Sequence, residues 1–152
     1  MSIDDEYELL RSIELFESLD PIQLKRLIFV SQRYQLKAGE YLFHQGDNSD
    51  NVFAIVHGEC SVLVDSNRGE IPIALQGSGE LVGEMAVITG EPRNASIRAT
   101  TDCEVIGFES ELFISTVIND PQTALSMMRL LSARLVNLRN QVEALSSDRI
   151  KS

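Results

Sequence analysis

The stretch from Gly83 to Ala99, GEMAVITGEPRNASIRA, gathers residue types that suit a bound anion. A short apolar turn follows Gly83 and Glu84, and the start of a helix offers unpaired backbone N–H groups and a partial positive charge. Gly83 has no Cβ to hold a ligand away from the backbone. Arg93 adds a planar, permanently charged fork that fits phosphate oxygens. Together these residues predict a phosphate site.

The residues that flank this arginine extend the predicted site. Asn94, Ala95 and Ser96 can offer backbone N–H groups, and Ser96 also has a hydroxyl. Glu84 would repel a bare phosphate, so its presence favours a ligand that also carries hydroxyl donors. A carboxylate beside a phosphate cradle suggests a ribose. The stretch therefore predicts a nucleotide with a single phosphate.

The overall composition confines such a site to a few groups. The chain has 152 residues, of which 43% are hydrophobic and 24% charged, as in an ordinary soluble domain. It has 13 basic and 23 acidic residues, a formal net charge of −10. Nucleic-acid binding needs a basic face, so we expect no nucleic-acid partner.

The cysteines, the histidines and the N-terminus argue against a metal protein, a secreted protein and a membrane protein. Cys60 and Cys103 lack metal-site spacing, and His44 and His57 form no H-x-H motif, so we expect buried free thiols and no metal. The start MSIDDEYELL has neither the basic nor the apolar region of a signal peptide. No apolar run approaches the length of a membrane span. We expect a cytoplasmic protein with no membrane partner.

Three blocks of sequence must position the site, and together they suggest a single domain over residues 1–152. Residues 1–31 have helical spacing, with one helix before Asp20 and another from Pro21 to about Val30. Residues 34–113 alternate short β-rich runs with turn clusters, which indicates an antiparallel sandwich or barrel. Within this block, GEMAVI resembles one helical turn. Residues 114–147 form a C-terminal hinge and helix, with the break at Asn119-Asp120-Pro121.

The C-terminal helix carries an apolar seam with the heptad spacing of a coiled coil. Its members are Met128, Leu131, Leu135, Leu138, Val142 and Leu145. The part from Met128 to Leu135 is expected to pack on the domain's own core. From Leu138 onward the surroundings become more polar, which favours a partner helix. We therefore predict a homodimer through this helix.

The sequence from Gly83 to Ala99 and its surroundings resemble those of a known family. The cyclic nucleotide-binding domains of bacterial catabolite activator proteins, kinase regulatory subunits and cyclic-nucleotide-gated channels share a phosphate-binding cassette. It reads approximately F-G-E-[LIM]-A and then P-R-x-A-[ST]-[VI]-[RK]-A, where this chain has VGEMA (82–86) and EPRNASIRA (91–99), which places the cassette at residues 83–97. The likeness covers nearly the whole chain. It implies a mainly β fold: an antiparallel β-roll or jelly roll with N-terminal helices, a short cassette helix and a long C-terminal helix.

The resemblance also implies roles for individual residues. Glu84 would bind the ribose 2′-hydroxyl and Arg93 the cyclic phosphate. The remaining cassette positions would line the short helix or complete the phosphate cradle: Gly83, Met85 and Ala86 for the helix, Ala95 and Ser96 for the cradle.

Two positions leave the choice of base open. Asn94 stands where a threonine favours cGMP in some members and alanine or serine is frequent in others, which leans mildly to cAMP. Arg134 lies close to where channel-type members carry an arginine that caps the base. Asn137, Leu138 and Arg139 are the other candidates for the cap, and a solvated Arg134 beside the seam is the alternative.

The resulting function is a regulatory sensor that binds cAMP or cGMP, moves its C-terminal helix and acts on a partner in trans. The serines lack a nearby histidine pattern, so we expect no enzyme. The first rival makes Arg93 an ordinary loop arginine paired with Glu84 or Glu91. For the sensor itself we also expect Arg93 to be an exposed loop arginine, whose loss the free fold would tolerate. The second rival is a degenerate β-roll, used for protein interaction or dimerisation, that no longer binds nucleotide.

Overall fold

The computed structural model describes residues 3–151, with the side chains of residues 4–146. The chain opens with Ile3–Arg11 (α1), a short 3-10 turn at Glu14–Phe16 (η1) and Pro21–Val30 (α2). The Asp20 carboxylate accepts a hydrogen bond from the Ile22 N–H at 2.8 Å, so the predicted start of α2 is confirmed. The single helix predicted before Asp20 is instead two pieces, because the tight turn of η1 carries Leu15 and Phe16 into the core.

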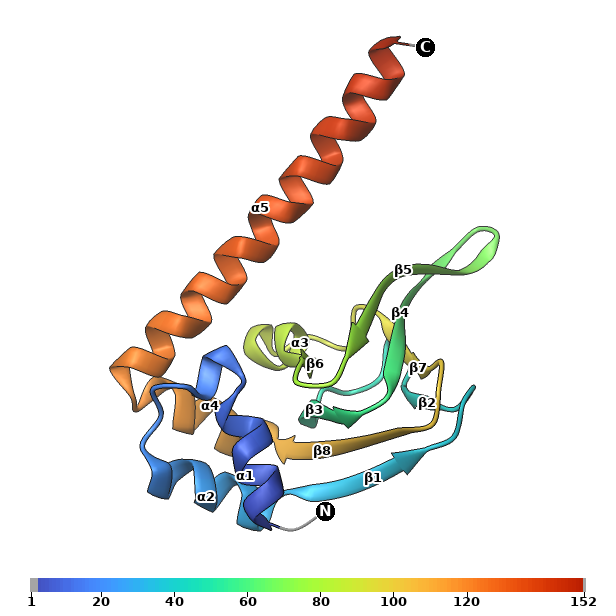
Figure 1. Cartoon of the computed structure of the whole chain (residues 1–152). Helices are drawn as coiled ribbons and strands as arrows, with labels where there is room; N and C mark the ends of the chain where they lie inside the picture. Colours follow the sequence, from blue (N-terminus) through green and yellow to red (C-terminus); the bar gives the residue numbers. More distant parts are fainter. Residues whose placement is uncertain (1–2, 152) are drawn as a thin grey trace.

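Two four-stranded antiparallel sheets form the body of the molecule (Figure 1). One sheet has the order β1-β8-β3-β6 and the other β2-β7-β4-β5. The strands are Gln32–Leu36 (β1), Tyr41–Phe43 (β2), Asn51–His57 (β3), Glu59–Ser66 (β4), Gly69–Gly77 (β5), Leu81–Val82 (β6), Ser96–Ala99 (β7) and Cys103–Glu109 (β8). The predicted β-roll is confirmed. It spans residues 32–109 rather than 34–113, because Ser110 already begins a helix.

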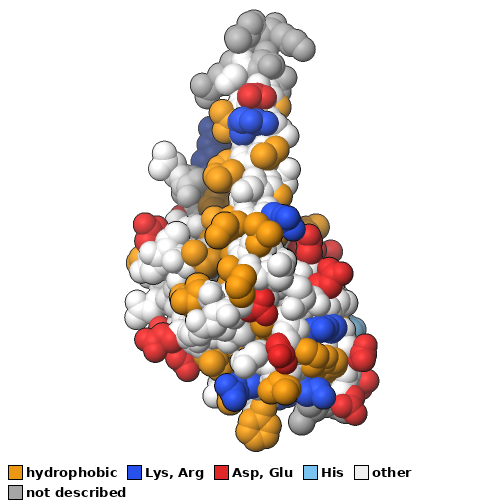
Figure 2. Space-filling model, turned by 90° about the vertical axis from the view of Figure 1, so that its left-hand side faces the viewer, with side chains coloured by type: hydrophobic (Ala, Val, Ile, Leu, Met, Phe, Trp, Pro, Cys, Tyr) orange, Lys and Arg blue, Asp and Glu red, His pale blue; other side chains and the backbone are white. Residues whose placement is uncertain are grey.

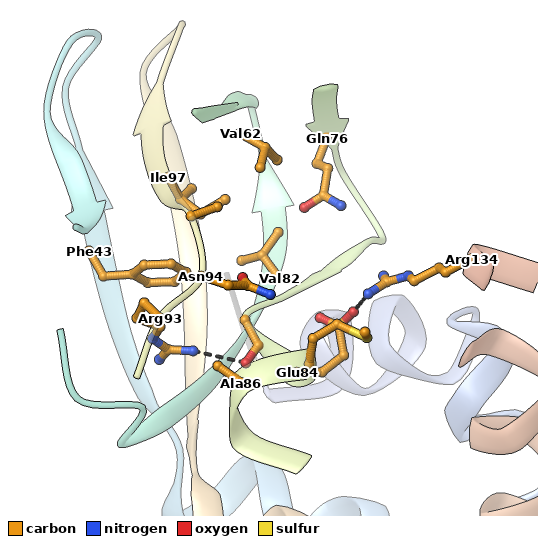
Figure 3. A pocket seen from close by; sticks show the side chains of 13 residues that line it. Phe43, Val62, Gln76, Val82, Glu84, Ala86, Arg93, Asn94, Ile97 and Arg134 are labelled. Atoms are coloured by element: carbon orange, nitrogen blue, oxygen red, sulfur yellow. Dashed lines mark hydrogen bonds and ion pairs between the residues drawn. The ribbon is translucent and has the colours of Figure 1, made fainter. Parts of the chain in front are cut away.

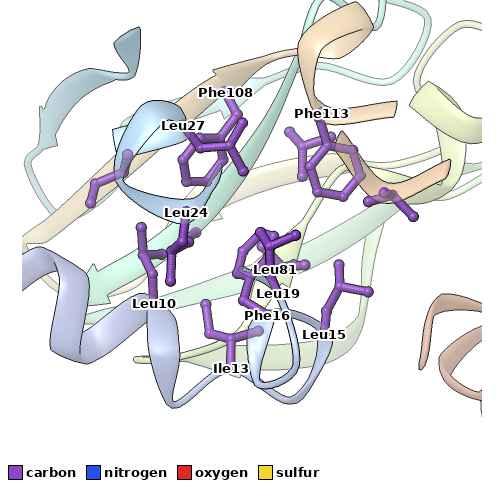
Figure 4. Packing of buried hydrophobic residues seen from close by; sticks show 14 of the residues in the cluster. Leu10, Ile13, Leu15, Phe16, Leu19, Leu24, Leu27, Leu81, Phe108 and Phe113 are labelled. Atoms are coloured by element: carbon purple, nitrogen blue, oxygen red, sulfur yellow. The ribbon is translucent and has the colours of Figure 1, made fainter. Parts of the chain in front are cut away.

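Strand β3 explains how the fold builds two cores from one apolar run. Val52, Ala54 and Val56 face the helices, whereas Phe53 and Ile55 face the second sheet. Successive strand residues point to opposite faces, so a strand covered on both sides is continuously apolar. On the helix side, the ring of Phe16 meets those of Phe108 and Phe113 edge to face, at centroid distances of 6.2 and 6.3 Å (Figure 4).

The two predicted buried thiols lie in the core between the sheets. Cys60 and Cys103 are free, and their Sγ atoms are 3.7 Å apart. Burial, and then the hydrogen bond between the two thiols, raises the pKa of Cys60 to about 12. Such a thiol stays protonated and unreactive at neutral pH.

Three helices complete the fold: Glu84–Thr89 (α3), Ser110–Ile118 (α4) and Pro121–Lys151 (α5). Helix α3 is the short helical turn predicted within the cassette. The predicted break falls between α4 and α5, where the Asp120 carboxylate accepts hydrogen bonds from the N–H groups of Gln122 and Thr123 at 3.1 and 3.2 Å. No helix within residues 3–151 combines the length and apolar character needed to cross a membrane.

Helix α5 packs on the body only through its first turns and then leaves it (Figure 1). Met127 is buried, and Leu130 and Leu131 are partly buried against the helical core. Of the seam residues from Met128 to Leu135 expected to pack on this core, Leu131 does so, whereas Met128 and Leu135 are 61% and 65% exposed. A straight helix presents different positions to the body and to solvent, so most of the heptad seam points away from the roll.

Candidate functional site

The cassette begins at a glycine that no other residue can replace without strain. Gly83 precedes α3 with φ +84°, a left-handed conformation. A Cβ built there would lie 2.5 Å from Nη1 of Arg93 and 3.3 Å from the Phe43 ring. Glycine at this position therefore lets the guanidinium lie directly against the cassette backbone.

Arg93 is held by backbone carbonyls and is buried, with only 4% of the residue exposed. Its Nη1 donates to the Gly83 carbonyl at 2.8 Å and its Nη2 to the Asn51 carbonyl at 2.5 Å. The guanidinium carbon lies 4.0 Å from the centre of the Phe43 ring. The expectation of an exposed loop arginine is therefore wrong, because this arginine ties α3 to β3.

The electrostatics leave this guanidinium without a compensating carboxylate at hand. Within the described residues, Arg93 forms no ion pair and its Nε has no hydrogen-bond partner. Burial lowers the pKa of Arg93, while the charges of Asp50 and Asp47 act to raise it. An arginine keeps its charge even so, and a buried cation with an unpaired donor is costly unless an anion joins it.

Glu84, the first residue of α3, is also buried, with 1% exposure. Its Oε1 forms an ion pair with Nη1 of Arg134, which reaches across from α5 (Figure 3). Burial lowers the pKa of Arg134, and the charge of Glu80 opposes this shift. The pairing of Arg93 with Glu84 or Glu91 does not occur. The Glu84 carboxylate is paired instead with an arginine of the long helix α5.

These groups line one cavity of about 140 Å³. Of the nine predicted site residues, all but Ser96 line it, and they are Gly83, Glu84, Met85, Ala86, Arg93, Asn94, Ala95 and Arg134. The Ser96 hydroxyl accepts a hydrogen bond from the Gln45 N–H at 2.8 Å, so it holds the preceding loop. The predicted roles of Glu84 at a ribose and of Arg93 at a phosphate stay predictions.

The match to a family model decides the family. The model of the cyclic nucleotide-binding domain matches residues 33–120, more than half of the chain and all of the cassette. The chain belongs to this family.

Relatives of this cyclic nucleotide-binding domain agree with the assignment. A lysophospholipase nte1 of Aspergillus oryzae is 31% identical over 122 residues, which cover 80% of this chain and 8% of that protein. The Thermus thermophilus catabolite activator protein is 28% identical, with a TM-score of 0.77 over 88% of this chain and 63% of that one. The sensor domain of the Pseudomonas aeruginosa transcriptional regulator DNR, 23% identical, shares the fold with a TM-score of 0.82 over 91% and 93% of the two chains.

The cavity of this domain also contains residues that the sequence did not single out. They come from strands of both sheets and are Phe43, Val62, Gln76, Val82 and Ile97. Gln76 is notable because it is polar, and its side chain lies across the cavity from Asn94 (Figure 3). Only the strand pairing, which places β5 beside β4, brings Gln76 to the site. A single sequence does not reveal that register. The only hint in the sequence is that Gln76 is a polar residue at the end of the apolar run IPIALQ.

Proposed function

We propose that this domain is a sensor that binds a cyclic nucleotide, cAMP or cGMP with a lean to cAMP, in the cavity beside α3. The observation that carries the proposal is the buried Arg93, whose Nε lacks a partner within the described residues. Glu84 and Arg134 are the other charged residues that line the cavity, which gives it a net positive lining in a chain of net charge −10. An anion with hydroxyl groups complements this arrangement.

The ion pair between Glu84 and Arg134 supplies a route from the ligand to the long helix. A ribose hydroxyl that donates to Glu84 competes with Arg134 for the same carboxylate. A ligand shifts a conformational equilibrium only by its difference in affinity between the two states. When a ribose hydroxyl replaces Arg134 as the partner of the Glu84 carboxylate, α5 would lose this contact. Its position relative to the roll would then differ between the free and the bound domain.

We further propose that the domain performs no catalysis, works in the cytoplasm, and acts through an effector in trans and as a homodimer. The alternative is a β-roll that has lost its ligand and serves only as an interaction or dimerisation module. The unpaired Nε of the buried Arg93 argues for ligand binding, because an arginine with a purely structural role would have no reason to leave a buried donor without an acceptor.

Titration calorimetry with cAMP and cGMP tests the proposal. We expect a Kd in the micromolar range or below for at least one of them, about −8 kcal/mol. Nucleotide at about 100 times its Kd should stabilise the fold by roughly 2.7 kcal/mol. No heat and no thermal shift up to millimolar nucleotide would leave the interaction module as the function.

A double-mutant design tests the position of the ribose. Glu84→Gln should weaken the binding of cAMP. The variant should bind 2′-deoxy-cAMP almost as well as it binds cAMP, since the substitution and the deoxy nucleotide each remove the same interaction. A full additional penalty for the deoxy nucleotide in the variant would place the 2′-hydroxyl elsewhere in the cavity.

A further inference from the structure

The outward face of α2 is apolar where a helix on the surface of a soluble domain is ordinarily polar. Phe29 is 81% exposed, Ile22 70% and Val30 54%, while the opposite face of the same helix is buried in the core. Exposed apolar side chains are common singly. Three of them on one ten-residue helix, including an aromatic ring almost wholly in solvent, form a surface that calls for a partner.

The charge of this face is the reverse of the charge of the rest of the chain. Residues 21–39 contain four of the 13 basic residues and none of the 23 acidic ones. Lys25 and Arg26 lie between Ile22 and Phe29 at the three- and four-residue spacing that places side chains on one face of a helix. The apolar and the cationic groups therefore form one surface, which we call the α2 face: Ile22, Lys25, Arg26, Phe29 and Val30.

Within the described residues, neither Lys25 nor Arg26 of the α2 face is neutralised by an ion pair. Lys25 Nζ lies 5.4 Å from the centre of the Tyr7 ring. Arg26 lines a groove that also contains Asp20 and Asp120, at the start of α2 and between α4 and α5. Arg33, just after the helix, is paired with the buried Glu6. The acidic groups of the groove thus border the start of the helix, while the exposed ring lies near its end.

The shape of this surface is convex. Figure 2 shows hydrophobic side chains protruding at the lower end of the molecule, over α2, between Lys and Arg side chains. A protein partner would need a preformed pocket for such a protrusion, whereas the interfacial region of a bilayer accommodates an aromatic ring beside cations without one.

We propose that the α2 face docks the domain on a lipid surface that contains anionic headgroups. The cations would meet the headgroups and the ring would enter the interfacial region. The strongly acidic remainder is repelled by the same surface and would orient the domain with α2 towards it. In Figure 1, α2 lies at the end of the molecule opposite to the free end of α5, so docking leaves that helix accessible. This proposal departs from the sequence-based expectation of no membrane partner, which rested on the lack of a spanning segment.

The chain has no tryptophan, so Phe29→Trp introduces a single fluorescent reporter into the α2 face. With mixed phosphatidylcholine–phosphatidylserine vesicles we expect a blue shift of its emission, and with pure phosphatidylcholine vesicles a much smaller one. The shift should decrease as salt is added, because salt screens the cations. The matched reporter is Ile73→Trp on β5, where Ile73 is 57% exposed, and its emission should not change.

Flotation with the same vesicles tests the wild-type surface without a reporter. Phe29→Ser should reduce the bound fraction about tenfold, since it removes most of the apolar contact, and Ile73→Ser should not reduce it. Lys25→Glu combined with Arg26→Glu should abolish flotation. Equal flotation of all variants, or no flotation of the wild-type domain, would overturn the proposal. A blue shift that needs no vesicles and grows with protein concentration would also overturn it, in favour of contact between two copies.

Discussion

At the scale of single residues, Arg93 serves two purposes that pull in different directions. Its two Nη atoms donate hydrogen bonds to the carbonyls of Gly83 and Asn51, which is a structural role, and its buried Nε has no hydrogen-bond partner among the described residues. Stacking on the Phe43 ring fixes the plane of the guanidinium. If Arg93 binds the phosphate as proposed, the side chain is already held in place before the ligand arrives, which reduces the entropy lost on binding.

Arg93→Ala should weaken nucleotide binding by tenfold to a hundredfold and also destabilise the free domain. Charge-assisted hydrogen bonds are worth about 1.5–3 kcal/mol each, which sets the loss of affinity. The substitution also leaves two carbonyl groups without their donor, at a cost of about 1–3 kcal/mol for each one that stays buried. Calorimetry gives the first quantity and urea unfolding the second.

Arg98→Ala is the matched control for this variant, because Arg98 lies on the adjoining strand and stacks on Tyr41 outside the cavity lining. It should bind nucleotide as the wild-type domain does. Arg93→Lys should retain part of the stability and less of the affinity, since an ammonium keeps the charge but not the fork. Normal binding by Arg93→Ala would move the phosphate site elsewhere.

At the scale of elements, local patterns predicted the helix at Asp20, the short helix after Gly83 and the break before Pro121. Each depends on residues that are neighbours in the sequence. The burial of Arg93 could not be predicted, because its acceptors come from Gly83 and Asn51, which only the tertiary fold brings together. For the same reason, the ion pair of Glu84 with a residue of α5 had no signal in the sequence.

Helix α5 depends on very few contacts for its position. Among the described side chains after Leu131, which are residues 132–146, Arg134 is the one that is not exposed, and it forms an ion pair with Glu84. A helix attached through its first turns and one ion pair is a low-stability element that a ligand can move.

Arg134→Gln should therefore raise nucleotide affinity threefold or more, because the ribose no longer competes with an ion pair for Glu84. Hydrogen exchange over residues 121–145 should differ between the free and the bound wild-type domain, and this difference should be smaller in the variant.

Deletion from residue 131 onward should leave weak phosphate binding and remove the change in hydrogen exchange. Arg129→Gln is the control for Arg134→Gln, since Arg129 is an exposed arginine of the same helix and lies outside the cavity lining. A lower affinity of Arg134→Gln would instead assign Arg134 to the base as its cap.

At the scale of the whole molecule, the cavity, the α2 face and the outer half of α5 differ in charge and lie in different places. The cavity is cationic inside an acidic domain, so the domain's field opposes the approach of an anionic nucleotide, and salt should speed association by screening that field. The α2 face and the outer half of α5 lie at opposite ends (Figure 1), so a lipid surface and a second copy would not compete. Each end presents apolar groups that the body does not cover.

The free part of α5 predicts a dimer. Its 31 residues extend about 45 Å at 1.5 Å per residue, and residues 135–146 are all exposed. Leu135, Leu138 and Val142 are 65%, 57% and 54% exposed on it. A helix of this kind is marginal alone in water, and a heptad seam is buried when two copies pair.

Sedimentation equilibrium at micromolar concentration should give twice the chain mass of 16.9 kDa for the wild-type domain. Leu138→Glu should shift it to the monomer, because two like charges would face each other in the seam without a counter-ion. Asn140→Glu adds the same charge on the same helix but outside the seam, so it should leave the dimer intact. Circular dichroism of the Leu138→Glu monomer should also show lost helix, since the outer turns depend on the partner. A wild-type domain that stays monomeric with α5 fully helical would show that the seam serves some contact other than a second copy.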